Sequence, residues 1–188
     1  MKTKVEPLLK YSLNSRKVAE ATEQCLKERG VKKRDIAELV LFLQKDYIPG
    51  LTLEEVYGHM ERVLAKREVQ NAILTGIQLD VLAEQGKLMQ PLQDIIYNDE
   101  PLYGCDEILA LSIVNVYGSI GFTNYGYIDK KKQGVLSMLN DKNDGKIHTF
   151  LDDIVGAIAA ATSSKIAHGY QAELEKKQLT ESEDANNI

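Results

Sequence analysis

The stretch "LNDKNDGKIHTFLDDIVGAIAAA", residues 139–161, carries a polar turn straight into an Ala-rich helix and decides how the chain folds. Thr149 is the predicted N-cap, which puts Asp152 and Asp153 in the first helical turn, where the helix dipole favours negative charge. From Gly156 onward the residues are small enough for close helix contact. We therefore expect this helix to be buried, with its first acids facing other groups rather than open water.

The same stretch does not form a calcium-binding EF-hand loop, which needs oxygen ligands at positions 1, 3 and 5, a glycine at 6 and an acid at 12. Counted from Asp141, Gly145 falls at position 5, where a ligand is required. Counted from Asn140, Lys142 takes a ligand position and Leu151 takes position 12. Neither frame works, so the stretch is interpreted as a turn that leads into an acidic helix start.

Apolar residues recur at helical spacing along most of the chain. Ile36, Leu39, Val40, Leu43 and Tyr47 follow an i, i+3, i+4, i+7, i+11 pattern, which predicts one apolar stripe on a helix. Further helices are predicted at residues 15–30, with Ser15 as the cap, at 52–66, with a Thr52–Glu55 capping box, at 67–86, closed by Gly86, at 91–97, at 105–118, and from Thr149 or Phe150 to about Lys177. The segment 105–118 is apolar nearly all round and is predicted to be the buried central helix.

Composition limits the class of protein. The chain has 188 residues and a net charge of −5, which does not favour nucleic-acid binding or a polybasic membrane anchor. No segment approaches the ~20 apolar residues of a membrane span, and Cys25 and Cys105 form no CxxC pair. We expect a soluble, cytoplasmic, all-α protein: a compact multihelical bundle with a buried central helix, forming a single domain over residues 1–180, and a flexible tail at 181–188.

A second acidic pair opens another apolar helix. Asp106 and Glu107 begin "DEILALSIV", and between the two pairs lies Asp129 beside Lys130–Lys132. Carboxylates brought to one end of a bundle repel each other unless a hard cation neutralises them, and Mg²⁺ takes carboxylates and water while leaving room for phosphate oxygens. The competing interpretation is that Asp152 and Asp153 are surface residues that only complement the helix dipole.

Three ordered blocks, "DEILALSIVNVYG", "YIDKKKQG" and "DGKIHTFLDDIVGAIAAA", resemble the phosphatidylglycerophosphatase A family over about residues 104–165. The resemblance implies a Mg²⁺-dependent phosphomonoesterase that makes phosphatidylglycerol from its 3-phosphate precursor. It implies Asp129, Lys132 and Asp153 as catalytic residues, and Asp106, Glu107, Asp129, Asp152 and Asp153 as metal ligands.

The chain departs from the family pattern at three positions. Gln133 replaces a proline, Gly126 stands where many relatives carry an arginine, and His148 replaces a glycine. His148 is interpreted either as an acid for the leaving group or, preferably, as a local hydrogen-bonding residue. The chain also lacks the family's membrane helices, so a lipid substrate requires approach to the bilayer from outside, through a face expected to include Tyr125, Tyr127 and Lys130–Lys132.

Two alternatives remain open from the sequence. All-α nucleotide pyrophosphatases also hold Mg²⁺ with helical acids, and Glu20 and Glu23 supply part of such a motif. A non-catalytic helical interaction protein could instead use residues 15–85 to form a homo-oligomer or to bind a partner. Co-location of Asp106, Asp129 and Asp153 would argue against this second alternative.

Overall fold

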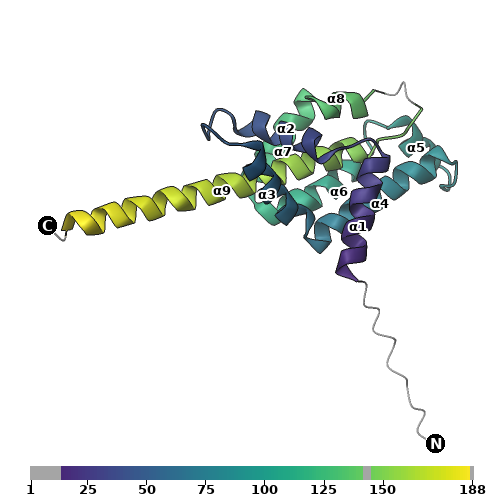
Figure 1. Ribbon diagram of the computed structural model, residues 1–188. Coiled ribbons are helices and arrows are strands. Elements are labelled where there is room, and N and C mark those ends of the chain that lie inside the picture. Colours follow the sequence, from purple (N-terminus) through teal and green to yellow (C-terminus); the bar gives the residue numbers. More distant parts are fainter. Residues whose placement is uncertain (1–13, 142–144, 187–188) are drawn as a thin grey trace, which may run out of the picture.

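Helices account for nearly all of the regular structure in the computed structural model, which describes residues 14–141 and 145–186 (Figure 1). They are α1 (Ser15–Glu28), α2 (Lys33–Gln44), α3 (Leu53–Leu64), α4 (Arg67–Glu84), α5 (Leu92–Asn98), α6 (Cys105–Val114), the 3₁₀ helix η1 (Asn115–Tyr117), α7 (Ser119–Lys131), α8 (Val135–Leu139) and α9 (Leu151–Asn186). These described residues contain no β-strand, and the predicted all-α fold is confirmed.

The first half of α9 is the central helix of the fold. Every side chain from His148 to Ser164 is buried, and α2, α3, α4, α6 and α7 all pack against this helix. The prediction placed the buried helix at residues 105–118, and that position is wrong: Ile108 on α6 is 66% exposed. The small residues of α9 let neighbours approach from every side, whereas the larger apolar residues of α6 cover only one face.

Close contact between α4 and α9 depends on a glycine. A Cβ atom at Gly76 would lie 2.3 Å from Ile154 Cδ1 and 2.9 Å from Phe150 Cβ, so any larger residue would push the two helices apart. Ile154 on α9 and Phe150, the residue before this helix, are fully or nearly fully buried. Gly76 therefore sets the distance between α4 and the start of α9, where the acidic pair lies.

Several predicted helix boundaries hold because they depend on local hydrogen bonds. The Thr52–Glu55 capping box is present, with Glu55 N donating to Thr52 Oγ1 at 3.3 Å and Thr52 N donating to Glu55 Oε2 at 2.8 Å. Gly86 follows α4 with a positive φ of 64°. The predicted cap of the first helix is off by one residue, because Asn14 Oδ1 accepts from Arg16 N at 2.9 Å and takes the role assigned to Ser15.

Other boundaries differ from the prediction. Helix α2 ends at Gln44, so Tyr47 leaves the apolar stripe and is 75% exposed. No helix was predicted around Asp129 and the lysines that follow it, yet they lie at the end of α7, whose last residue is Lys131. Its glycines and polar residues hid the helical periodicity, and both α7 and α8 are additions to the predicted set.

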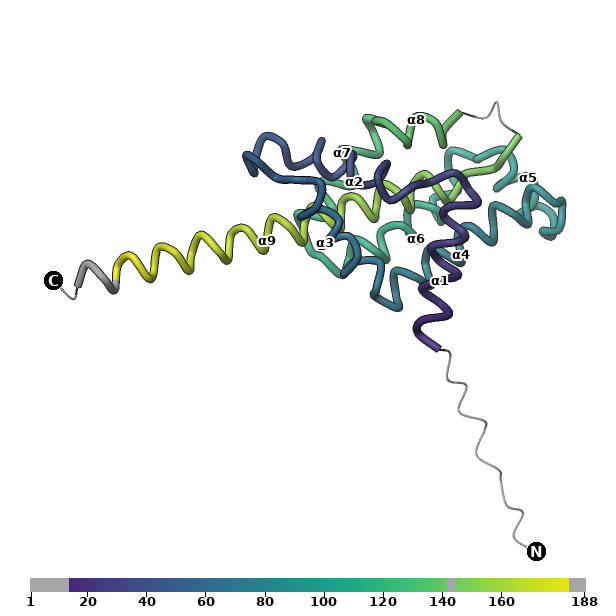
Figure 2. Tube along the Cα trace, viewed as in Figure 1, coloured from purple at the N-terminus to yellow at the C-terminus, as the bar shows by residue number. Residues whose placement is uncertain are grey.

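Helix α9 continues far beyond the body of the molecule (Figure 2). It ends at Asn186 rather than near Lys177, so most of the predicted tail at 181–188 is helical. In the predicted turn, residues 142–144 lie outside the described residues, as do 1–13 and 187–188. Among the helices that are described, none has both the length and the apolar character needed to cross a bilayer.

Candidate metal centre

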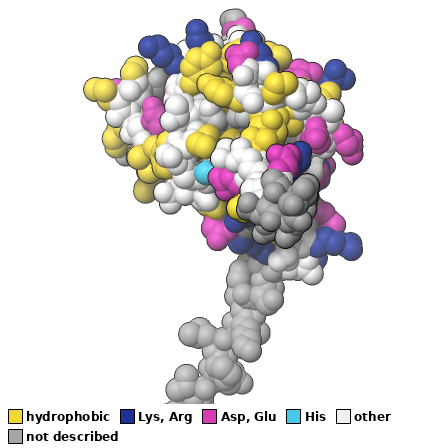
Figure 3. All heavy atoms as spheres, turned by 90° about the vertical axis from the view of Figure 1, so that its left-hand side faces the viewer, with side chains coloured by type: hydrophobic (Ala, Val, Ile, Leu, Met, Phe, Trp, Pro, Cys, Tyr) yellow, Lys and Arg dark blue, Asp and Glu magenta, His cyan; other side chains and the backbone are white. Residues whose placement is uncertain are grey.

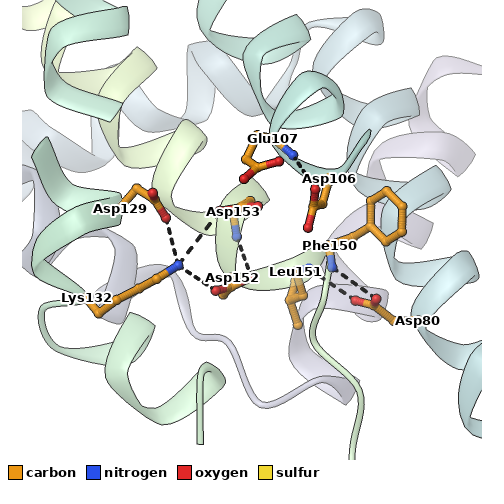
Figure 4. A network of polar contacts seen from close by, with 9 residues as sticks. All are labelled: Asp80, Asp106, Glu107, Asp129, Lys132, Phe150, Leu151, Asp152 and Asp153. Atoms are coloured by element: carbon orange, nitrogen blue, oxygen red, sulfur yellow. Dashed lines mark hydrogen bonds and ion pairs between the residues drawn. The ribbon is translucent and has the colours of Figure 1, made fainter. Parts of the chain in front are cut away.

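Three carboxylates meet where α6 and α9 begin (Figure 4). Asp106 and Glu107 come from the first turn of α6 and Asp153 from the first turn of α9, and each offers an oxygen within 4.8 Å of the other two. Asp106 and Asp153 are buried, while Glu107 is exposed. The arrangement follows from local sequence, because both helices start with acids and both starts lie at the same end of the molecule.

Lys132 connects this group to two further carboxylates. It follows α7 in a left-handed conformation with φ of 45°, and its Nζ lies 2.7 Å from Asp129 Oδ1 and 2.8 Å from Asp152 Oδ2. The same Nζ lies 3.9 Å from Asp153 Oδ1. The structure thus brings together all six residues that the family resemblance indicated, although they come from three separate segments.

Crowding and burial favour the neutral form of these acids. Burial, reinforced by the neighbouring Asp152 carboxylate, raises the pKa of Asp153 to about 9. Burial and a hydrogen bond with Glu107 raise the pKa of Asp106 to about 7. Burial also raises the pKa of Asp152, although Lys132 opposes the shift. A divalent cation would offset the same repulsion that the bound protons relieve.

The donor set fits Mg²⁺. Asp106, Glu107 and Asp153 supply hard carboxylate oxygens, which this ion prefers. A further polar group faces them: the buried Tyr125 hydroxyl lies beside the Asp153 carboxylate, and burial together with that carboxylate raises the pKa of the tyrosine. A water or ligand oxygen at the centre would satisfy this hydroxyl, which has no hydrogen-bond partner of good geometry in the described part of the chain.

Asp80 is a site residue that sequence reasoning missed. It lies on α4 with no exposed surface, and its Oδ1 and Oδ2 accept from Phe150 N and Leu151 N, each at 3.1 Å. It therefore caps the start of α9 from another helix. Burial raises its pKa to about 8, against the effect of the two N–H donors and of Arg29. The sequence carried one signal for this residue, an aspartate on the apolar face of the α4 helix, one turn after Gly76.

Thr149 does not act as the predicted N-cap. Its Oγ1 donates to the Ile96 carbonyl at 2.7 Å, which ties the approach to α9 against α5. The N–H groups at the helix start are satisfied by Asp80 instead. A cap supplied by a residue 70 positions away could not be inferred from local spacing.

A second polar network holds the segment before α9. Arg29 pairs with Glu84 at 2.6 Å and donates to the Ile147 carbonyl, and Glu84 Oε1 accepts from Ile147 N at 2.8 Å. His148 Nδ1 lies 3.2 Å from Arg29 Nη2, and the ring is buried. His148 is thus placed for local hydrogen bonding, the preferred of its two interpretations.

The geometry also bears on the two alternatives. Glu20 pairs with Arg16 and Glu23 with Lys33, both on exposed surface, so neither joins the acidic cluster that a nucleotide pyrophosphatase would need. Asp106 and Asp129 both influence Asp153 electrostatically, as expected for groups at one centre. This co-location argues against a purely structural role for the acids.

The fold and the cluster define an all-α protein with a carboxylate centre at the ends of its helices. The chain belongs to the phosphatidylglycerophosphatase A family, whose model matches residues 31–168. It is 70% identical over 143 residues to YutG of Bacillus subtilis (strain 168), described as an uncharacterized protein, covering 76% of this chain and 86% of the relative.

Two solved structures share the fold at high sequence identity. The low temperature requirement C protein from Listeria monocytogenes is 66% identical, with a TM-score of 0.80, and the match covers 82% of this chain and 97% of that one. The ypjQ protein from Bacillus subtilis is 52% identical, with a TM-score of 0.82, over 85% of this chain and 99% of that one. The family and the fold are therefore established independently of the site.

Proposed function

We propose that this protein is a Mg²⁺-dependent phosphomonoesterase that releases phosphate from phosphatidylglycerophosphate. The observation that carries the proposal is the meeting of Asp106, Glu107 and Asp153 within 4.8 Å, with Lys132 beside them. Membership of the phosphatidylglycerophosphatase A family supports a phosphatase activity of this kind. The Mg²⁺ requirement and the lipid substrate are part of the proposal.

The chemistry divides among the residues by position and exposure. Mg²⁺ held by Asp106, Glu107 and Asp153 would supply positive charge for the phosphate oxygens and for an attacking water. The Lys132 ammonium adds a point charge for another phosphate oxygen. The carboxylate of Asp152, whose side chain is only 10% exposed, pairs with that ammonium and holds it in position.

Asp129 is the proposed general base. Its side chain is 36% exposed, compared with 10% for Asp152 and 7% for Asp153, so it is the Lys132 partner most open to substrate and water. A carboxylate in this position can accept the proton of the attacking water while the phosphate is held by its neighbours. A Cβ added at Gly126, three residues earlier on α7, would have no atom within 4 Å, so no side chain from this position covers Asp129.

The test is phosphate release from phosphatidylglycerophosphate in detergent micelles, with Mg²⁺ or with EDTA, beside glycerol 3-phosphate as a water-soluble substrate. We expect Mg²⁺-dependent release by the wild type and a loss of at least about a hundredfold in Asp129→Asn, the scale of general-base catalysis. Asp46→Asn, an exposed aspartate distant in sequence from the centre, is the matched control and should retain activity.

Unfolding of each variant by heat separates loss of chemistry from loss of structure. Full activity in a folded Asp129→Asn protein would refute the assignment of the base. Release that is equal in EDTA and in Mg²⁺ would refute the metal requirement. Release from glycerol 3-phosphate but not from the lipid would refute the lipid substrate while leaving the phosphomonoesterase chemistry in place.

A further inference from the structure

Exposed apolar side chains flank the carboxylate end of the molecule. We call Tyr97, Leu102, Ile108 and Met138 the apolar rim; they are 51%, 90%, 66% and 69% exposed. Ile108 directly follows Glu107 in the first turn of α6, and Leu102 lies in the turn that leads into α6. Large apolar side chains this exposed, grouped beside a site, indicate an interaction surface.

The other two members of the apolar rim flank the start of α9. Tyr97 and Leu139 line one small pocket together with Asp152, and Met138 is the neighbour of Leu139 on α8. Leu139 turns into the core at 7% exposure while Met138 turns outward. The apolar rim therefore comes from segments on two sides of the centre, α5 to α6 and α8.

The turn that carries Leu102 is held firmly. Tyr103 packs edge-on against Phe150, with ring centroids 5.8 Å apart, and its backbone N–H donates to the Glu100 carbonyl at 2.9 Å. The Leu102 N–H donates to Glu100 Oε2 at 3.1 Å. Because its neighbour is anchored to the start of α9, Leu102 is fixed in an outward position instead of folding back onto the body.

At the end of the molecule opposite the carboxylate centre, helix α9 leaves the body, and hydrophobic side chains gather around its base (Figure 3). Tyr47, Ile120 and Tyr170 line a cavity of about 360 Å³ at this end. Helix α9 projects from this end of the molecule, whereas the apolar rim lies at the end that α9 does not obstruct (Figure 1).

We propose that the apolar rim inserts into the surface of a phospholipid bilayer and places the carboxylate centre at the level of the lipid headgroups. The inference rests on the proposed function, because a phosphomonoester on a lipid is presented at that level. The exposed Lys130 and Lys131 at the end of α7 lie next to Lys132 and would contact headgroup phosphates. Docking at this end directs α9 away from the bilayer.

The structure corrects the membrane-facing surface expected from the sequence. Tyr125 is only 5% exposed and cannot reach a bilayer. Tyr127 stacks on Phe42 with ring centroids 6.1 Å apart, and Lys132 is engaged by Asp129 and Asp152. Of that surface, Tyr127, Lys130 and Lys131 remain exposed, with Lys131 Nζ 5.9 Å from the centroid of the Tyr127 ring, and the apolar rim supplies the further apolar contacts.

Binding should depend on apolar contact more than on charge. The chain carries a net charge of −5, and Glu100 on the Leu102 turn is exposed, so an anionic bilayer attracts the molecule only locally. Salt screens such attraction but does not weaken apolar insertion. We expect the vesicle-bound fraction to change less than about twofold between ~0.1 and ~1 M NaCl.

The experiment is sedimentation with vesicles of phosphatidylcholine and phosphatidylglycerol, without any substrate. The double variant Leu102→Asp, Met138→Asp should bind roughly tenfold less tightly, since two exposed apolar anchors become charged. Leu179→Asp, the same change at a 65% exposed leucine on the projecting part of α9, is the matched control and should bind as the wild type does.

Vesicle binding and phosphate release are measured in separate assays. The inference is supported when wild type and Leu179→Asp bind vesicles equally and the double variant binds roughly tenfold less tightly. Where the wild type hydrolyses glycerol 3-phosphate or micellar lipid, both variants should do so equally. Binding with this pattern supports the inference even when phosphate release is absent, an outcome that refutes only the proposed function. Hydrolysis without vesicle binding, or equal loss of binding in both variants, would overturn the inference.

Discussion

Asp80 should be one of the most sensitive polar positions in the protein, and Asp80→Ala is the sharpest test of the structure. The substitution leaves the N–H groups of Phe150 and Leu151 without acceptors in a region with no solvent access. Each unsatisfied buried group costs about 1–3 kcal/mol, which gives a gross loss of roughly 2–6 kcal/mol. Part of this loss in stability is offset, because the substitution also removes a carboxyl group that was itself costly to bury.

We therefore expect the free energy of unfolding to fall by about 2–4 kcal/mol. With a urea dependence of about 2 kcal/mol per molar, typical of small proteins, the midpoint should fall by about 1–2 M. Asp80→Asn keeps one acceptor and should lose about half as much. The exposed Asp46→Ala is the control and should stay within ~0.5 kcal/mol of wild type.

An Asp80→Ala protein as stable as the control would refute this prediction, since the two hydrogen bonds from Phe150 N and Leu151 N to Asp80 would then contribute nothing. Equal losses for alanine and asparagine would also count against it, because they would show that the acceptor atoms are irrelevant. Magnesium binding, measured by calorimetry on the folded asparagine variant, should weaken as well, because Asp80 positions the helix turn that carries Asp153.

Three further predictions concern packing, pH and charge. Gly76→Ala should destabilise the protein by about 1–3 kcal/mol in urea unfolding, because the added Cβ overlaps α9. Gly58→Ala, at a helical glycine with open space around it, should instead be neutral or stabilising by up to ~1 kcal/mol, and a shared sign would contradict the packing. Burial raises the pKa of Asp153 to about 9, so the folded state binds the proton of this carboxyl more tightly than the unfolded state does. Without metal, the contribution of Asp153 to thermal stability should therefore be largest below about pH 4 and should fall as the pH rises towards 9. Saturating Mg²⁺ should flatten that decline, and an identical pH profile with and without Mg²⁺ would count against the centre. Lys132→Met should lower phosphate affinity in inhibition assays while leaving Mg²⁺ binding measurable, and unchanged inhibition would show that the lysine does not face the substrate.

Some local signals in the sequence were reliable, whereas contacts between distant segments left no signal in it. The capping box at Thr52 and the acids at the starts of α6 and α9 depend on residues within one turn of each other, so spacing alone predicted them. The cap that Asp80 supplies joins α4 to α9, and no periodicity reports such a pair. Only the structure could therefore reveal what holds the acidic turn in place.

The buried central helix shows a second limit. Segment 105–118 was chosen for its hydrophobicity, yet Ile108 is exposed, and the first half of α9 is buried all round. Hydrophobicity measures the gain from burial, whereas the identity of the central helix depends on how many neighbours can approach it. Gly156 and the alanines around it allow that approach, and a scale of apolar character assigns them little weight.

The length of α9 has a consequence for how the molecule moves in solution. Beyond Tyr170, which still lines a cavity at the body, residues 171–186 extend outward, and 16 residues at 1.5 Å each make an arm of about 24 Å. A rigid arm increases translational friction beyond that of a sphere of the same 21.0 kDa. Gel filtration of a single copy would therefore overestimate its mass and could be misread as a dimer. Sedimentation equilibrium does not depend on shape, and it is the measurement that can decide whether the chain forms a homo-oligomer.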